Sequence, residues 1–264
     1  MVIFKRFFNS KLNMNNPYGT SKFGSETAKG GFRNEDEVIF KFNSWKTDLE
    51  AKEWLDVMGY KLKEIENVKA IKVNGYKTDV QVQVTIETSK AISVENLSIK
   101  LVSNKQGYNQ IDKRWVDKYK ELWEIPNNIT MLLKLYTGEL QSIKKDIRDK
   151  RRMFFDEMNK DEQKSILSFF ESNKIKIVND IIMGRGQFAA RWMLVALILK
   201  KESKWVLKSI NEAMNIFGNG QILITKNGNL KIGNITMQRK GGDAGRKTAN
   251  MLQFKINPCL LFNV

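Results

Sequence analysis

Two strand-like runs in the first half of the chain constrain its fold more than any other feature. Apolar and polar residues alternate over 80–87 and again over 97–101, which is the period of a strand with one buried face. A turn-prone segment separates the runs, so the sequence predicts that they pair as neighbouring strands. With 264 residues and 42% hydrophobic content, the chain can bury one sizeable core.

Three polar residues fall together on this expected pair of strands. Asp79 stands at the mouth of the first strand, and Ser98 and Lys100 point to the same face of the second. A carboxylate can bind a divalent cation and an ammonium beside it can stabilise a phosphate, which is the chemistry of metal-dependent phosphodiester cleavage. Taken alone, Asp79 could equally cap a turn, and Lys100 could be a solvated strand lysine.

Asp79 and the Ser-x-Lys run also carry a family resemblance. Eighteen residues separate Asp79 from Ser98, and three further blocks occur in order along the chain: ETAKGGFRNE, GRGQFAARW and MQRKGGDAGRKTANMLQFKINP. From about Thr27 to the C-terminus, this arrangement resembles a type II restriction endonuclease of the small group that recognises GCGC.

The resemblance implies an α/β fold with a restriction-endonuclease-like core, named PD-(D/E)XK, in which helices flank a central mixed sheet. It also implies Mg²⁺ as the cofactor and a metal site at Asp79 and Ser98, with Lys100 orienting or deprotonating the attacking water. In many such nucleases the first helix contributes a glutamate near the metal, which makes Glu35 a further catalytic candidate. Glu35 could instead be a solvated carboxylate favoured by the helix dipole.

One residue departs from the family pattern. The family has a glutamine two residues before the catalytic lysine, where this chain has Ser98. A hydroxyl can hold a metal-bound water, but direct metal ligation by a side-chain amide carbonyl would be lost. We therefore expect Ser98 to position a ligand water.

Three residues in the middle of the chain are candidates for contacts with DNA. Gln110 and Lys113 match family positions that enter the minor groove and touch the DNA backbone, although both could simply lie at an exposed helix start. Arg185 stands between two glycines, and a glycine-flanked arginine can pair with a phosphate. The same glycines could form a plain turn before a helix.

A C-terminal loop carries donors and acceptors suited to base recognition. Guanine is best bound by Arg or Lys, and cytosine N4 donates to a carboxylate or carbonyl, so this mixture favours G·C pairs. The same side chains could be ordinary phosphate contacts. We expect guanine donors at Arg239, Lys240 and Arg246, a cytosine acceptor at Asp243, and amides that can do either at Gln238, Asn250 and Gln253.

The charge of the chain favours a polyanionic partner. Lys and Arg number 45 against 29 Asp and Glu, a formal net charge of +16, which is typical of proteins that bind nucleic acid. Double-stranded DNA is favoured over an anionic membrane surface. Codon usage in an AT-rich genome is an alternative source of the abundant lysine.

Two absences exclude several classes of chemistry. The chain has no histidine, which excludes Ser-His-Asp hydrolysis, histidine-dependent nucleases and most zinc catalysis. Cys259 is the only cysteine, so neither an intrachain disulfide nor a thiolate zinc cluster can form.

The apolar run 192–199 is too short to span a bilayer, and we expect no targeting segment, no membrane association and a bacterial cytoplasmic location.

The patterns also predict elements and domain limits. We expect a disordered extension over 1–24 and one endonuclease domain over 25–264, with the catalytic core at about 30–125 and a β-rich DNA-recognition region at about 180–264. Helices are expected over 35–45 with Asn34 as N-cap, 47–58, 110–123, 131–140, 150–158, 160–172, 188–199 and 210–217; further strands are expected over 70–73, 205–207, 221–225, 230–232, 235–237 and 250–256. The short apolar run 188–199 could instead be a strand.

The expected function is that of a type II restriction endonuclease. It would make Mg²⁺-dependent double-strand cuts in a short palindromic site, GCGC, leaving a 5′ overhang, and it would be paired with a cognate DNA methyltransferase. Either a monomer or a homodimer is compatible with the sequence. Two alternatives stay open: a non-catalytic DNA-binding protein with a decayed nuclease core, and a structure-specific repair nuclease of the same fold.

Overall fold

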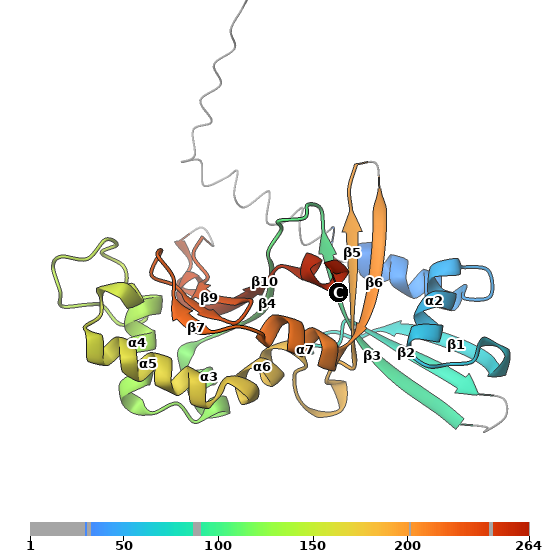
Figure 1. Ribbon diagram of the computed structural model, residues 1–264, viewed down its shortest axis with the longest axis horizontal. Helices are drawn as coiled ribbons and strands as arrows, with labels where there is room; N and C mark the ends of the chain where they lie inside the picture. Colours follow the sequence, from blue (N-terminus) through green and yellow to red (C-terminus); the bar gives the residue numbers. More distant parts are fainter. Residues whose placement is uncertain (1–29, 31–32, 87–90, 201, 243–244, 264) are drawn as a thin grey trace, which may run out of the picture.

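Two five-stranded sheets lie side by side along the long axis of the molecule, with helices at both ends (Figure 1). The computed structural model describes residues 30, 33–86, 91–200, 202–242 and 245–263. The expected N-terminal extension, residues 1–24, and the expected base-reading Asp243 lie outside these residues.

The first sheet, called sheet A below, contains the paired strands that the sequence predicts. Val80 lies opposite Leu97 in the antiparallel ladder between β2 and β3, so that pairing is confirmed. β3 and β5 run parallel, which makes the sheet mixed. Its strands, in spatial order, are β1 (Ile65–Lys72), β2 (Val80–Ile86), β3 (Ala91–Val102), β5 (Trp192–Ile198) and β6 (Ser203–Ser209).

The apolar segment 188–199 forms strand β5, and the expectation of a buried helix there is wrong. Both faces of β5 are covered: Met193 and Val195 belong to one hydrophobic core, whereas Leu194 belongs to the other. A parallel strand buried on both faces has no alternation of apolar and polar residues, so its sequence pattern resembles that of a buried helix.

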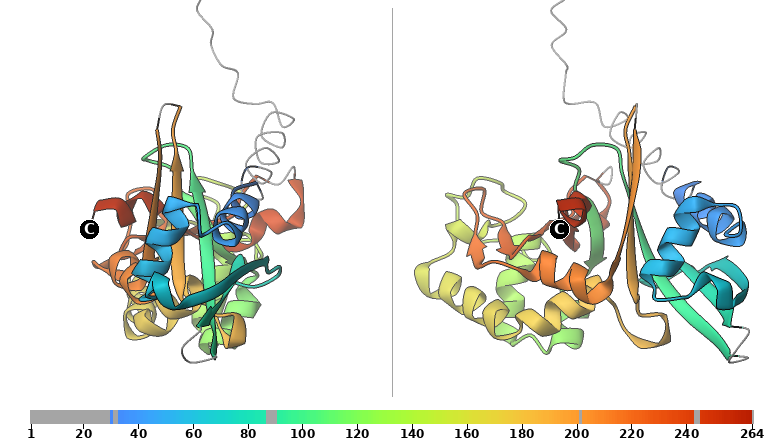
Figure 2. Two further views of the ribbon diagram at one scale, coloured as in Figure 1. Left: turned by 90° about the vertical axis from the view of Figure 1, so that its right-hand side faces the viewer. Right: turned by 45° about the vertical axis from the view of Figure 1, so that its right-hand side comes forward.

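Two helices cover one face of sheet A (Figure 2). The first includes 33–43 and the second is α2 (Leu49–Val57). Phe42 and Trp54 from these helices pack into a core with Val80 and Leu97 from the sheet. The expected N-cap at Asn34 is wrong, because Asn34 is already helical.

The second sheet, called sheet B below, is antiparallel throughout. Its apolar face packs with the neighbouring helices and with the second face of sheet A in one continuous core. The strands, in spatial order, are β4 (Asn109–Arg114), β10 (Leu252–Ile256), β9 (Ile235–Arg239), β8 (Leu230–Ile232) and β7 (Ile222–Ile224).

The remaining helices surround sheet B and the junction between the sheets (Figure 1). The expected helices at 160–172 and 210–217 are confirmed as α5 and α7, whereas α6 has no counterpart among the sequence expectations. They are α3 (Val116–Trp123), α4 (Asn127–Thr137), α5 (Lys160–Ser172), α6 (Lys174–Ile182) and α7 (Ile210–Gly218), with single-turn or short 3₁₀ helices at η1 (Leu62–Glu64), η2 (Phe155–Glu157), η3 (Gly186–Phe188), η5 (Lys247–Asn250) and η6 (Pro258–Asn263).

Two further helix expectations are wrong. Residues 109–114 form β4, because they pair with β10, and the helix begins only after Trp115. The segment 150–158 holds only the short η2, because Arg151 and Arg152 fold back onto the carboxylate of Asp149. Gln110 and Lys113 therefore lie on a strand.

The two regions expected from the sequence interleave in space. Strands β5 and β6 come from the expected recognition half but complete sheet A, whereas β4 comes from the expected catalytic half and forms one edge of sheet B. Among the described residues, no helix combines the length and the apolar character needed to cross a membrane.

Candidate active site

Asp79 lies between the end of β1 and the start of β2, beside the middle of β3. Its backbone N–H donates to the Leu97 carbonyl at 2.8 Å, and its own carbonyl accepts from the Val73 N–H at 3.0 Å. These bonds tie the residue to β3 on one side and to the segment after β1 on the other. The backbone of Asp79 is therefore fixed by the sheet.

One carboxylate oxygen of Asp79 accepts hydrogen bonds from three donors on β3. Its Oδ2 accepts from the Ile99 N–H at 2.6 Å, from Ser98 Oγ at 3.3 Å and from Lys100 Nζ at 3.4 Å. The convergence of Asp79, Ser98 and Lys100 that the strand patterns predict is present in the structure. Their catalytic and metal-binding roles stay predictions.

The other oxygen of Asp79 is left open. Within the described ranges, no hydrogen bond or ion pair reaches Asp79 Oδ1, and the side chain is 25% exposed. Ser98, by contrast, is only 2% exposed. Hydrogen bonds therefore fix one oxygen of the carboxylate, while the side chain as a whole stays partly exposed.

Glu35 lies within electrostatic reach of Asp79. Burial raises the pKa of the Glu35 carboxyl above 4.5, and the charge of Asp79 raises it further, whereas Lys72 and Lys100 act in the opposite direction. Lys72 Nζ lies 2.8 Å from Glu35 Oε2. The neighbouring negative charges of Glu35 and Asp79 form a site to which a cation is attracted.

The carboxylate oxygens of Asp79 and Glu35 are ligands of the kind that a hard divalent cation prefers. Mg²⁺ is commonly bound by one or two carboxylates and keeps several waters, which matches the open Asp79 Oδ1 with Glu35 nearby. Among the described residues, no group of three or more His, Cys, Asp or Glu side chains could enclose a metal ion. A buried zinc cage therefore does not fit this part of the chain, whereas a partly hydrated Mg²⁺ ion does.

Gln110, Lys113 and Arg185 border one cavity of about 480 Å³. Gln110 and Lys113 are exposed on β4. Arg185 is 48% exposed, and its Nε donates to the buried Asp180 Oδ1 at 2.6 Å. Lys77, two residues before Asp79, lines the same cavity, so the cavity adjoins the Asp79 cluster.

Sequence reasoning missed the buried ionic network beneath this cavity. Asp112 accepts from Lys77 Nζ at 2.8 Å and from Arg114 at 2.9 Å. Arg114 also reaches Asp180 at 3.0 Å. A helix was expected over 110–123, and it gave no reason to single out Asp112 and Arg114. Only strand β4 places these two residues against the neighbouring helices.

The C-terminal loop residues divide into two groups. Arg239 donates to the Thr137 carbonyl at 2.8 Å and to Asn250 Oδ1 at 2.6 Å, which joins both side chains to the end of α4. Gln253 is 3% exposed, and its amide lies 3.4 Å from the Lys240 carbonyl. Gln238 and Lys240 are half-buried and Arg246 is exposed. None of these residues contacts the Asp79 cluster through a described hydrogen bond.

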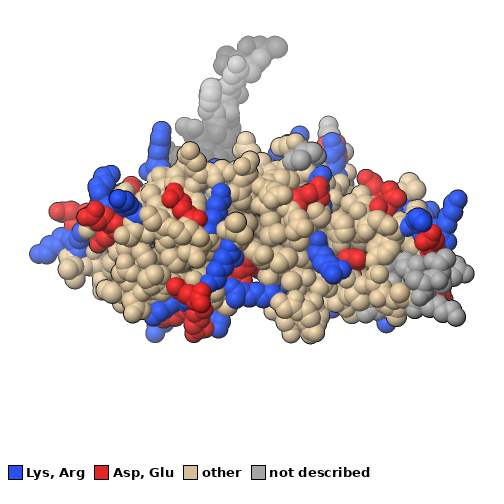
Figure 3. Space-filling model, turned by 60° about the horizontal axis from the view of Figure 1, so that its bottom comes forward, with Lys and Arg blue, Asp and Glu red and all other residues tan. Residues whose placement is uncertain are grey.

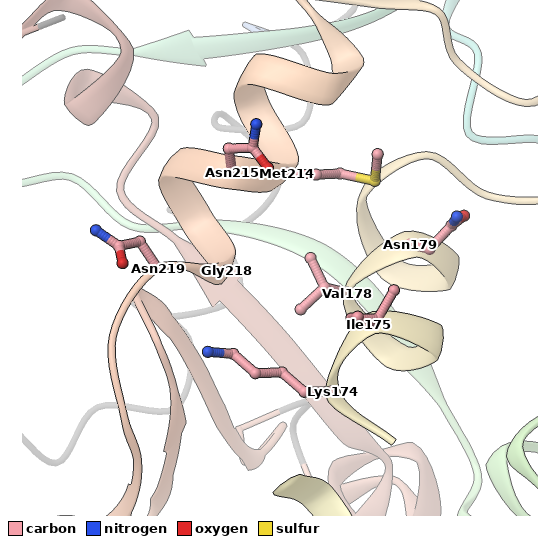
Figure 4. A pocket seen from close by; sticks show the side chains of 8 residues that line it. All are labelled: Lys174, Ile175, Val178, Asn179, Met214, Asn215, Gly218 and Asn219. Atoms are coloured by element: carbon pink, nitrogen blue, oxygen red, sulfur yellow. The ribbon is translucent and has the colours of Figure 1, made fainter. Parts of the chain in front are cut away.

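Two surface features lie apart from the Asp79 cluster. A cavity of about 610 Å³ between α6 and α7 is lined by Lys174, Val178 and Met214 among others (Figure 4). On the face seen in Figure 3, basic and acidic side chains are interspersed without a continuous basic area. The excess of positive charge is therefore not gathered on this face.

The architecture matches that of a solved nuclease. The crystal structure of restriction endonuclease MspI in complex with its cognate DNA superposes with a TM-score of 0.65, covering 89% of this chain and 92% of that chain at 14% sequence identity. A likeness at this identity establishes the fold. The mixed sheet with its flanking helices is therefore that of the restriction-endonuclease fold.

A family model described as R.HinP1I restriction endonuclease matches residues 58–262. The chain belongs to the R.HinP1I restriction endonuclease family and is a site-specific deoxyribonuclease. Restriction endonucleases of this kind generally use divalent metal ions. No curated protein matches the chain.

Proposed function

We propose that this endonuclease makes Mg²⁺-dependent double-strand cuts in a short palindromic DNA site, GCGC, and leaves a 5′ overhang. The observation that carries the proposal is the asymmetry of the Asp79 carboxylate, in which three donors hold Oδ2 while Oδ1 has no partner in the described residues. An oxygen fixed in this way is suited to a cation that must be placed accurately against a phosphate.

Asp79 Oδ1 and Glu35 would hold the Mg²⁺ ion. When bound, the cation supplies positive charge that stabilises the developing charge on the phosphate. The Ser98 hydroxyl hydrogen is directed at Asp79 Oδ2, which leaves the oxygen of Ser98 to accept from a water beside the carboxylate. Ser98 thus orients the carboxylate and positions a water, without itself replacing the glutamine of the family pattern as a ligand.

Lys100 would act on the substrate directly. Its Nζ lies 3.4 Å from Asp79 Oδ2 and 2.9 Å from the Ile99 carbonyl. An ammonium has three hydrogens, so the third is free to meet the attacking water or a phosphate oxygen. The lysine is 15% exposed, and its charge therefore acts in a partly dehydrated setting, where it is stronger than in bulk water.

DNA would lie across the cavity beside the Asp79 cluster. Gln110 would enter the minor groove, Lys113 would contact the backbone, and Arg185 would pair with a phosphate. The bound DNA in the MspI structure supports this proposal, since that protein shares the fold. The exposed Lys113 has no partner among the described residues, which leaves its full charge for a phosphate.

The G·C preference would come from the loop between β9 and β10. Gln238, Lys240 and Arg246 are at least partly exposed and could meet base edges, with Asp243 as an acceptor for cytosine. Arg239, Asn250 and Gln253 form hydrogen bonds with neighbouring protein groups. They would therefore also shape the loop that brings the other base-contacting residues to the DNA. Each bidentate contact with the right base is worth about 1–3 kcal/mol of discrimination.

The enzyme would function in a bacterial cytoplasm with a DNA methyltransferase that modifies the same site. The described residues of one chain supply a single Asp79 cluster, so a double-strand cut requires either two chains on one site or two successive cuts by one chain. Both a homodimer and a monomer satisfy this requirement.

Plasmid digestion tests the proposal. The purified protein is incubated with a plasmid of known sequence in Mg²⁺, with chelator as the control, and the ends are sequenced. We expect discrete fragments that end at GCGC with a 5′ overhang, and resistance of the same plasmid after cytosine methylation of these sites. Ends at another palindrome would contradict the specificity, and intact DNA would contradict the nuclease.

A further inference from the structure

Lys77 is a half-buried lysine two residues before Asp79, and it connects the segment between β1 and β2 to strand β4. Its side chain is 16% exposed and its Nζ lies 2.8 Å from Asp112 Oδ2 on β4. The same Nζ donates to the carbonyl of Ile111. The segment that contains Lys77 and Asp79 is therefore bound to strand β4, which carries Gln110 and Lys113.

The Ile111 carbonyl is presented by a bulge in β4. In the ladder with β10, Phe254 faces Asp112 and Lys255 faces Gln110, so Ile111 has no partner residue. A bulge re-aims the backbone at one point of a strand. Here it turns a carbonyl of sheet B toward the ammonium of Lys77, in the segment between β1 and β2.

The Asp112 carboxylate is held rigidly from its other side. Tyr119 Oη donates to Asp112 Oδ1 at 2.7 Å, and Arg114 lies 2.9 Å from Oδ2. Asp112 is 4% exposed as a side chain. Buried ion pairs contribute little net stability compared with apolar packing, so an arrangement of this kind is better explained by the geometry that it fixes.

A glycine makes room for the Lys77 side chain. Gly184 has φ of +83°, and a Cβ added there would lie 2.8 Å from Lys77 Cβ. The adjacent Thr78 donates to the Phe188 carbonyl at 2.7 Å. The segment that follows α6 therefore packs directly on the two residues that precede Asp79.

We infer that Lys77 is a positioning residue that sets the place of Asp79 relative to strand β4. This inference rests on the proposed function, because it concerns how the cation-binding carboxylate is aligned with the DNA-contacting strand. Lys77 acts through the backbone of Thr78 and Asp79 and touches neither the cation nor the phosphate. Displacing Lys77 should therefore misplace the cation site while leaving the DNA contacts in place.

Two matched pairs of variants test the inference. Lys77→Met removes the ammonium, and Lys41→Met removes an ammonium of similar exposure, 15%, that pairs with Asp48 and Glu50 and not with strand β4. Gly184→Ala pushes Lys77 aside without changing its charge. Gly59→Ala adds the same strain at φ of +89° with no atom within 4 Å of the new Cβ.

The measurements are the single-turnover cleavage rate at saturating DNA, the Mg²⁺ concentration for half-maximal rate, DNA affinity in Ca²⁺, and Tm. We expect Lys77→Met and Gly184→Ala to lower the rate by about tenfold to a hundredfold, as misplaced reacting groups do, and to raise the half-maximal Mg²⁺ concentration several-fold. DNA affinity in Ca²⁺ should change by less than about twofold, since no phosphate contact is removed.

The controls separate positioning from mere stability. If Lys77→Met and Gly184→Ala lowered Tm as their controls do but left the rate and the Mg²⁺ requirement at wild-type values, the inference would be overturned. A variant pair that lost DNA affinity and rate together would overturn it as well. Failure of the proposed function is distinct, because the wild-type protein would then cut no DNA in the same assay.

Discussion

At the scale of single residues, the chemistry depends on which atoms of the two carboxylates are already engaged. Asp79 Oδ2 is held by Ile99, Ser98 and Lys100, and within the described part of the chain the ion pair of Glu35 with Lys72 uses Oε2. The open oxygens are thus those that a cation could take. The sequence predicted the residues, but it could not predict this division between engaged and open atoms.

Glu35 should make cation binding dependent on pH. Its pKa is raised above 4.5 chiefly by burial. Its favourable contribution to the free energy of unfolding is therefore present below pH 4.5 and is lost as pH rises through the raised pKa. A cation favours the charged carboxylate, so Ca²⁺ should raise Tm at pH values above the raised pKa of Glu35. This rise in Tm should disappear as the pH falls below that pKa.

Calorimetry of the wild-type protein and Glu35→Gln, each with and without Ca²⁺ across pH, measures this effect. The neutral variant should show a smaller rise in Tm and a weaker dependence of that rise on pH. An identical Ca²⁺ response in both proteins would place Glu35 outside the cation site.

Ser98 should contribute modestly to cleavage. Ser98→Ala removes one hydrogen bond to Asp79, and a bond of this kind contributes about 1 kcal/mol, so the cleavage rate should fall by about fivefold. Ser98→Gln restores the residue type of the family pattern and should retain activity. Single-turnover rates for both variants decide the point: an inactive Ser98→Gln beside a fully active Ser98→Ala would contradict the alignment of this strand.

At the scale of secondary-structure elements, the sequence correctly predicted the strands that show one apolar and one polar face. The alternation over 80–87 and 97–101 predicted β2 and β3 correctly because one face of each run is apolar. β5 was mistaken for a helix because both of its faces are buried. β4 was mistaken because its pairing partner β10 lies about 140 residues away along the chain, and local spacing carries no information on such pairing.

Strand β4 should contribute to DNA binding through charge. Lys113 is exposed and Arg185 is neutralised by Asp180, so Lys113→Ala should reduce the slope of log K against log salt by about 0.9. Arg185→Ala should lower Tm as well, because it leaves the buried Asp180 with fewer partners. Fluorescence anisotropy over a salt series measures the slope; an unchanged slope in Lys113→Ala would remove that residue from the backbone contacts.

At the scale of the whole molecule, the candidate site draws on both of the sheets that lie side by side (Figure 1). Asp79 and its donors come from sheet A, while Gln110 and Lys113 come from the edge of sheet B. The sequence predicted the cluster because its two strands are close along the chain, whereas the mixed α/β fold was expected from the family resemblance, since the parallel pairing of β3 with β5 joins distant segments. It could not predict Lys77, Asp112 or Asp180, because their pairing joins segments that only the packed molecule brings together.

If the Asp79 cluster cuts DNA, Asp79→Asn should separate cleavage from DNA binding. Asparagine keeps the shape of the side chain and removes its charge. We expect the cleavage rate in Mg²⁺ to fall at least about a thousandfold, since the loss of cation chemistry costs several kcal/mol. We expect the fold and DNA binding to be retained. Cleavage at the wild-type rate by a folded, DNA-bound Asp79→Asn would show that the Asp79 carboxylate does not take part in cleavage.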